Sequence, residues 1–237
     1  MLIKNQAIVL SSISYGDTGK IIRFYTQSSG ISSFIAKGVY SKKNKINSLL
    51  SPLNFVELVY DDKKSGQLLH FKEIRQLHYY QNFHQNPEKI SIGFFLAEIL
   101  NSVLKEEEAN PDLFKFLSFS FLEFDKKETI IADFHLWFLF QLTQFLGFYP
   151  LLNSELPYFN LEEGISTKTP PVNFSLSEEE FFLWNKLSKL DFFNQTSLQF
   201  NQKQRNLLLN LLLKYYELHI SDFRLPNSLK VLNVVFE

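Results

Sequence analysis

The sequence of 237 residues contains no cysteine. Disulfide bonds, zinc sites built from thiolates and cysteine nucleophiles are therefore excluded. Glycine and proline are also scarce, at eight residues each, which excludes collagen-like and low-complexity chains. Hydrophobic residues make up 45% of the chain and charged residues 21%. This composition excludes intrinsic disorder and predicts one large or two small folded domains.

Long uninterrupted apolar runs are missing as well. The most apolar stretch, residues 130–149, is interrupted by Asp133, His135, Gln141 and Gln144. A membrane span needs about 20 residues and rarely holds so many polar groups, so we expect a buried helix here. The start, Met1–Gln6, is too short and polar for a signal peptide. We therefore expect a cytoplasmic protein without membrane contact.

Aromatic residues are abundant, at 16% of the chain. In the first 75 residues they occur with β-branched residues in short runs that are bounded by Gly, Ser, Asn and Asp, a pattern typical of strands. The expected strands are residues 7–10, 21–26, 31–36, 55–60 and 67–72. Five short strands without a helical pattern among them suit a small closed barrel.

After residue 80 the hydrophobic period changes from 2 to about 3.6, which predicts helices. We expect helices that begin at Pro87 and Pro111, a helix over 129–146 that ends at Gly147, one opened by a capping box at Ser177, and a last long one from about Asn201. Residues 151–176 lack a helical period and form an irregular insertion. The sequence predicts a multidomain α+β protein, with a β-barrel domain in residues 1–80 and an all-α domain in residues 81–237.

The net charge of −1 conceals an asymmetry between these two parts. Residues 1–80 contain eleven Lys and Arg against five Asp and Glu, whereas residues 81–237 contain thirteen against twenty. A basic barrel beside an acidic helical part indicates a polyanion-binding module joined to a second function. A chance distribution of solvated charges is the alternative.

Motifs for catalysis are missing. The segment Gly16–Lys20 resembles a phosphate-binding loop, but Ser14 and Ile21 stand where that motif needs a glycine and a serine or threonine. The five histidines lack the paired spacing of metal ligands, and the acidic runs 106–108 and 178–180 fit helix ends. We therefore expect no enzyme, no cofactor and no bound metal.

A basic cluster with aromatic neighbours is what the sequence offers instead. Lysines on a barrel surface bind phosphates without reading base sequence, and exposed aromatic rings give bases a surface to stack on. Tyr40 is the expected stacking residue, because it lies in a polar loop that follows Gly38. The expected DNA-binding residues are Lys20, Arg23, Lys37, Tyr40, Lys42, Lys43 and Lys45.

Short segments in both parts of the chain follow one another in a characteristic order. They are Ala7–Leu10, Tyr15–Asp17, Ile22, Thr26, Gly30, Ala36–Gly38, Phe94–Leu100 and Leu146–Pro150. Together they resemble the bacterial RecO family of DNA repair proteins. The resemblance implies an N-terminal OB-fold, a C-terminal helical domain, binding of single- and double-stranded DNA, and annealing of complementary strands. It also implies action at the nucleoid with RecR and the C-terminal tail of single-strand-binding protein, to load the recombinase RecA.

The chain departs from the family in one segment. Many members carry a four-cysteine zinc motif after the stretch that matches Gly147–Pro150, whereas Leu151–Pro171 contains no cysteine. We expect packing, through Tyr158, Phe159 and Leu161, to hold this part. If the C-terminal tail of single-strand-binding protein is acidic and apolar, it would need a hydrophobic groove edged by basic side chains. The candidates for these side chains are Lys186, Lys189, Lys203 and Arg205.

Two other functions stay open. The barrel could bind an acidic tail of a partner protein and no nucleic acid, with the helices forming an oligomer. Alternatively, a hydrolase site could assemble from a histidine and two acids that are scattered in sequence. Salt-sensitive DNA binding would argue against the first function, and a single cleft that gathers such residues would favour the second.

Overall fold

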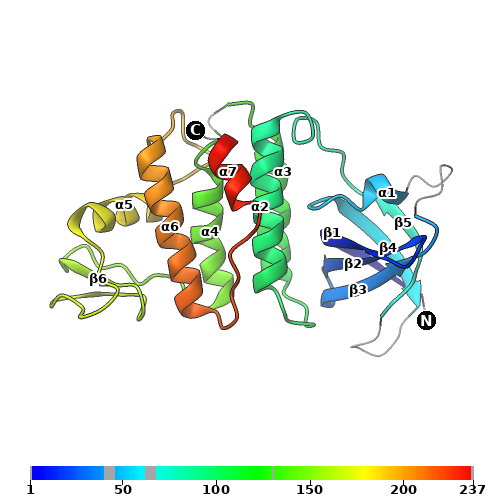
Figure 1. Ribbon diagram of the computed structural model, residues 1–237, viewed down its shortest axis with the longest axis horizontal. Coiled ribbons are helices and arrows are strands. Elements are labelled where there is room, and N and C mark those ends of the chain that lie inside the picture. The colour runs from blue at the N-terminus through cyan, green and yellow to red at the C-terminus, as the bar shows by residue number, and fades with distance from the viewer. Residues whose placement is uncertain (1, 40–45, 62–67, 130, 236–237) are drawn as a thin grey trace. The chain divides into compact units, whose positions relative to one another are not determined.

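The computed structural model describes residues 2–39, 46–61, 68–129 and 131–235 of the chain (Figure 1). The chain divides into two compact units, residues 1–125 with 226–228 and residues 126–225 with 229–237. The first unit contains the N-terminal sheet and the two long helices that follow it. The predicted boundary between a barrel domain, residues 1–80, and a helical domain, residues 81–237, lies inside this unit and stays a prediction.

The first unit is built on a five-stranded antiparallel sheet with the order β3-β2-β1-β4-β5. The strands are β1 (Leu2–Tyr15), β2 (Gly19–Thr26), β3 (Gly30–Ala36), β4 (Phe55–Asp61) and β5 (Phe71–Gln76). A parallel bridge between Phe34 on β3 and Leu69, just before β5, closes the sheet into a barrel. The N–H of Ile35 donates to the carbonyl of Leu69 at 2.8 Å. This barrel followed by helices is the predicted OB-fold architecture.

Two strands differ from their predicted ranges. The predicted strand 67–72 is replaced by β5 at Phe71–Gln76, because the backbone of Leu69 pairs with β3 and the ladder with β4 starts only at Phe71. The first strand is longer than predicted and continues to Tyr15 as the partner of β2. Its N-terminal half, Leu2–Ile8, also pairs with β4.

Alternating side chains fill the barrel with apolar residues. Ile22 and Phe24 on β2 point into the core, so that Arg23 between them lies on the outer face. The ring of Phe34 meets Phe24 and Tyr60 edge-on, at centroid distances of 5.4 and 5.0 Å. The short helix α1 (Ile46–Leu49), which the sequence did not predict, packs both of its terminal residues against this core.

Helices α2 (Pro87–Val103) and α3 (Pro111–Lys126) complete the first unit and begin at the two predicted prolines. The side chain of Asn86 caps α2 by accepting two backbone N–H groups. Lys89 on α2 is fully buried. Its Nζ donates to the carbonyls of Phe124 and Asp125 at 3.0 and 2.8 Å, which satisfies acceptors that the end of α3 leaves unpaired.

Asp125, near the C-terminal end of α3, is a buried carboxylate. It accepts the backbone N–H groups of Gln81, Asn82 and Phe83 at distances between 2.7 and 2.9 Å. Together with Lys89, this carboxylate fastens the connection between barrel and α2 to the end of α3. Hydrogen bonds to a charged acceptor are stronger than neutral ones, so this node stabilises the first unit.

The second unit contains the remaining helices and a two-stranded sheet. Its elements are α4 (Phe134–Leu146), β6 (Tyr158–Asn160), β7 (Ile165–Thr167), α5 (Glu178–Ser188), α6 (Gln202–His219) and α7 (Leu229–Val235). The predicted capping box at Ser177 is present, and Asn201 forms a second one with Gln204. Helix α4 begins later than predicted, because Phe134 N–H donates to Ile131 in a separate turn before it.

Aromatic packing holds the segment between α4 and α5. Phe159 and Leu161 are buried as predicted, whereas Tyr158 is only partly covered. Phe159 lies 6.0 Å from the ring of Trp184. His219 on α6 shares a 2.9 Å hydrogen bond with the carbonyl of Leu161. These contacts hold the segment without a metal ligand from cysteine, as the sequence predicts.

No helix in the described ranges is both long and apolar enough to cross a membrane.

Replacing Asp125 with alanine should destabilise the first unit by about 2–4 kcal/mol, because three backbone N–H groups lose a charged acceptor. We expect faster hydrogen exchange at residues 81–83 and a lower urea midpoint by circular dichroism. Asp112→Ala is the matched control, since Asp112 is exposed and pairs with Lys115 on the same helix. Equal midpoints for the two variants would contradict the assigned role of Asp125.

His135 should make the second unit sensitive to acid. Burial, with the nearby charge of Arg205, lowers the pKa of His135 from 6.5 to about 3. The unfolded chain therefore binds a proton that the folded chain rejects between these values. The contribution of His135 to the free energy of unfolding is fully present above pH 6.5. Between pH 6.5 and about 3 the free energy of unfolding falls by about 1.4 kcal/mol per pH unit because of this group.

The variant His135→Gln removes this titration. Burial raises the pKa of the neighbouring Asp133, but that group is present in both proteins and cancels in the comparison. Urea unfolding at pH 7.5, 6 and 5 should show a steeper loss of stability for the native chain than for the variant. Parallel curves would exclude His135 as the source of the acid sensitivity.

Candidate nucleic-acid interface

Three strand ends meet at one end of the barrel. Tyr15 pairs with Gly19, and Lys20 pairs with Ala36 on β3. Beyond the strands, the N–H of Val39 donates to the carbonyl of Thr18 at 3.0 Å. The end formed by residues 15–20 and 36–39, called the basic rim below, therefore carries Lys20 on β2 and Lys37 directly after β3.

Lys20 reaches from β2 to α1. Its Nζ donates to Oδ1 of Asn47 at 2.8 Å. A neutral amide does not cancel the ammonium charge, and an ammonium group carries three donors. The contact with Asn47 orients Lys20 at the rim.

Lys37 is exposed directly after β3, and Gly38 turns the chain behind it. Gly38 has a φ of 68°, in the left-handed region that favours glycine, although a Cβ there would meet no atom within 4 Å. The glycine is thus needed for its backbone conformation and not for space. It directs the chain from Lys37 to Val39, which is buried in the barrel core.

Tyr40, Lys42, Lys43 and Lys45 lie outside the described residues. The residues on either side, Val39 and Ile46, both pack against the barrel core. Val39 belongs to the basic rim, and Asn47, next to Ile46, accepts the hydrogen bond from Lys20.

Arg23 lies apart from Lys20, on the outer face of β2. Its guanidinium donates to the carbonyls of Asn101 and Leu104, both at 2.6 Å, and to Oδ1 of Asn101 at 3.1 Å. Burial lowers the pKa of Arg23, yet an arginine stays charged at neutral pH. The side chain fastens the end of α2 to the barrel, and its predicted contact with DNA stays a prediction.

The opposite end of the barrel is acidic. The N–H of Ile31, at the start of β3, donates to the carbonyl of Glu106 at 2.9 Å. A Cβ on Gly30 would collide with the backbone of Glu106 and Glu108, so this segment lies directly on the strand. The exposed run Glu106–Glu108 is thereby held about 20 Å from the basic rim, the length of a seven-residue strand.

Sequence reasoning missed two exposed side chains beside the basic rim. Ile13 and Tyr15, near the end of β1, are 61% and 51% exposed. The signal for them is the alternation Ser-Ile-Ser-Tyr over residues 12–15, which places both apolar side chains on one face of an extended strand.

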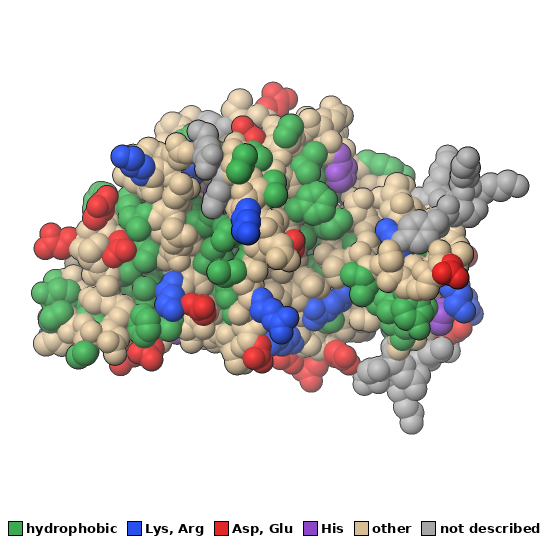
Figure 2. Space-filling view, viewed as in Figure 1, with side chains coloured by type: hydrophobic (Ala, Val, Ile, Leu, Met, Phe, Trp, Pro, Cys, Tyr) green, Lys and Arg blue, Asp and Glu red, His purple; other side chains and the backbone are tan. Residues whose placement is uncertain are grey.

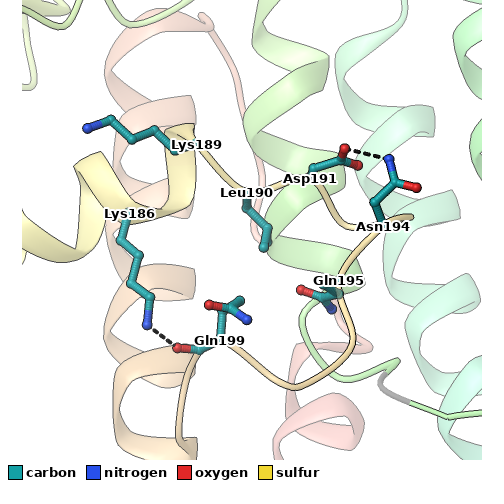
Figure 3. Close-up of a pocket in the computed structure, with 7 residues that line it drawn as sticks. All are labelled: Lys186, Lys189, Leu190, Asp191, Asn194, Gln195 and Gln199. Atoms are coloured by element: carbon teal, nitrogen blue, oxygen red, sulfur yellow. Dashed lines mark hydrogen bonds between the residues drawn. The ribbon is translucent and has the colours of Figure 1, made fainter.

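The second unit contains a pocket of about 370 Å³ at the end of α5 (Figure 3). It is lined by Lys186, Lys189, Leu190, Asp191, Asn194, Gln195 and Gln199. Lys186 points to the carbonyl of Gln199, while Lys189 extends the other way from the helix (Figure 3). Asp191 accepts a hydrogen bond from Asn194 at 2.7 Å. The pocket combines the apolar Leu190 with two lysines.

Two other candidate edges are not in the lining of this pocket. Arg205 is largely buried, donating to the carbonyl of Phe200 at 2.6 Å and lying 3.9 Å from the carboxylate of Asp133. Lys203 is exposed on α6. Within the described ranges, no group of three or more His, Cys, Asp or Glu side chains is placed to hold a metal ion.

Comparison with known proteins agrees with this architecture. A family model described as recombination protein O N terminal matches residues 1–80, and one described as recombination protein O C terminal matches residues 84–229. The DNA repair protein RecO of Christiangramia forsetii is 38% identical over the full length of both chains. Those of Flavobacterium psychrophilum and Bacteroides fragilis are 35% and 33% identical, also over full length. The resemblance inferred from the sequence is confirmed, and the chain belongs to the RecO family of DNA repair proteins.

Proposed function

We propose that this chain is a non-enzymatic mediator of DNA repair and recombination that binds single- and double-stranded DNA and anneals complementary strands. The observation that carries the proposal is that one end of the OB barrel carries both Lys20 and Lys37, shortly before Lys42, Lys43 and Lys45 in the sequence. Membership of a DNA repair family supports the choice of DNA as the polyanion.

Lysines that contact phosphates release condensed counterions, and this term does not depend on base sequence. Binding of this kind suits annealing, because two strands of any sequence are held without their base edges being engaged. On the helical part of the face shown in Figure 2, basic and acidic side chains are interspersed. We therefore assign the main DNA contact to the basic rim.

RecR and the C-terminal tail of single-strand-binding protein are the proposed partners, with which the chain would load recombinase at the nucleoid. The pocket beside α5 is our candidate for the tail. An acidic and apolar peptide needs positive charge beside an apolar surface, and the pocket offers Lys186 and Lys189 next to Leu190.

The double variant Lys20→Ala/Lys37→Ala should weaken binding of a labelled single-stranded oligonucleotide and reduce its salt dependence. Each phosphate contact contributes about 0.7 to the slope of log affinity against log salt for single strands. Anisotropy titrations at several salt concentrations measure both quantities. The triple variant of Lys42, Lys43 and Lys45 to alanine should act in the same direction.

Lys115→Ala is the control for this experiment, because Lys115 is exposed on α3 and pairs there with Asp112. An unchanged slope in both the double and the triple variant would refute the basic rim as the phosphate contact. A native chain without salt-sensitive binding at low micromolar concentration would favour the module that binds an acidic protein tail. Strict dependence of annealing on ATP would contradict a mediator without enzymatic activity.

The variant Lys189→Glu should weaken binding of a synthetic peptide of the single-strand-binding protein tail about three- to tenfold, since it reverses a charge at the pocket. Lys203→Glu makes the same change on an exposed lysine outside the pocket lining and should leave the affinity unchanged. Isothermal titration calorimetry measures both. Equal losses in the two variants would indicate general attraction and exclude the pocket as the binding site.

A further inference from the structure

The first unit contains a pocket of about 200 Å³, called the α2 pocket below. It is formed by the loop before β4, the segment before α2 and the first half of α2, all of which belong to that unit. Its lining residues are Ser51, Pro52, Phe83, His84, Ile90, Gly93 and Phe94. Cofactors and drug-sized ligands occupy pockets of about 300–1,000 Å³, so the smaller volume here fits one large apolar side chain.

One wall of the α2 pocket depends on a close approach of Phe83 to helix α2. A Cβ on Gly93 would overlap the ring of Phe83, so only glycine gives the ring room at this turn of the helix. The backbone N–H of Phe83 donates to the buried carboxylate of Asp125 at 2.7 Å, which fixes the residue in place. The ring of Phe83 is therefore held as a rigid wall.

The loop wall of the pocket is fixed by Leu53, directly after Pro52. Leu53 is buried and has a φ of 65°, in the left-handed region that is uncommon for leucine. Its N–H donates to the carbonyl of Val9 at 2.7 Å, and its carbonyl accepts the hydroxyl of Tyr80 at 2.8 Å. Strained backbone persists only where its surroundings hold it, and it is concentrated at binding and switch sites. The α2 pocket is therefore preformed.

The lining of the pocket joins an exposed apolar surface to a few polar groups. Phe94, directly after Gly93, keeps 50% of its surface exposed. Ser51 and His84 are the polar lining residues, and the ring of His84 meets Phe83 edge-on at 5.4 Å. Such a lining matches an apolar side chain on a polypeptide, because backbone amides can bond to the hydroxyl and the imidazole while the side chain is buried.

Charge distinguishes the α2 pocket from the pocket beside α5. The described residues that line the α2 pocket include no Lys, Arg, Asp or Glu, whereas Lys186, Lys189 and Asp191 line the other. A phosphate or carboxylate buried in the α2 pocket would lose its hydration without gaining an ion pair to a lysine or arginine. The lining therefore selects an uncharged apolar group, and neither a nucleic acid nor an acidic tail matches it.

We propose that the α2 pocket is a docking site for a protein partner, which inserts one phenylalanine or a similarly large uncharged side chain from an exposed segment. Protein interfaces concentrate their binding energy in such anchors, which fill a pocket and are surrounded by contacts that exclude water. Phe94 supplies this surrounding contact. The inference does not depend on the DNA contacts proposed above, because the two surfaces share no residue.

The test follows the methyl group of Ile90 by NMR in the full-length chain, with N-acetyl-phenylalaninamide as the probe. This probe carries the anchor side chain between two peptide groups. We expect its addition to shift the Ile90 signal, identified by its loss in Ile90→Val, in a saturable manner. The charged analogue N-acetyl-glutamate amide should cause no saturable shift. A shift that grows linearly with probe concentration, or an equal response to the charged analogue, would overturn the docking site.

A pair of variants assigns the binding to this pocket. Phe94→Ala should weaken binding of the probe about three- to tenfold, because it removes part of the apolar wall. Phe119→Ala is the matched control, since Phe119 is 54% exposed on α3 and is not among the lining residues. Alanine favours the helical backbone at both positions, so both variants should fold. Equal losses in the two variants would exclude the α2 pocket as the binding site.

Toluene separates docking of a polypeptide from binding of a free small molecule. It has the ring of the probe and no peptide groups. We expect toluene and the probe both to shift the Ile90 signal, and Phe94→Ala to weaken both. A response to toluene without one to the probe would show a cavity that is closed to a polypeptide, which would contradict the proposed docking.

Discussion

The hydrogen bonds from Arg23 to the end of α2 decide which surface of the barrel stays open to a ligand. They form on the outer face of β2, because strand alternation turns Ile22 and Phe24 into the core. The same face carries Tyr25, whose ring stacks on Phe114 of α3 at 6.2 Å. Burial raises the pKa of Tyr25 to about 12. These contacts cover the outer face of β2 at Arg23 and Tyr25 with helices.

Acidic and basic side chains lie at opposite ends of β3. This separation gives a nearly neutral protein a local positive charge, which the proposed binding of a polyanion needs. The acidic run Glu106–Glu108 is anchored at the start of β3, and Lys37 follows its end. Their separation of about 20 Å exceeds the Debye length of about 8 Å at physiological ionic strength. Repulsion from the acids is therefore screened at the lysines, as the proposed DNA binding requires.

Patterns with a local physical cause could be predicted from the sequence. The prolines at 87 and 111 and the capping residue Ser177 marked helix starts correctly, since each acts within one turn. The sequence predicts the fifth strand four residues too early, because the barrel closes where Leu69 pairs with Phe34, more than thirty positions away in the chain. The outer position of Arg23 follows from alternation, but its partners on α2 do not. Ile13 and Tyr15 alternate visibly with serines, yet their exposure depends on where β4 stops pairing.

The aromatic cluster of the second unit gives the chain a built-in optical label. Trp137 on α4 and Trp184 on α5 are the two tryptophans of the sequence, and both belong to that unit. Trp184 is fully buried against Phe140 and Tyr215. Tryptophan emission therefore reports the second unit alone. Unfolding of the second unit can therefore be followed in the intact chain, because the barrel contributes no tryptophan emission.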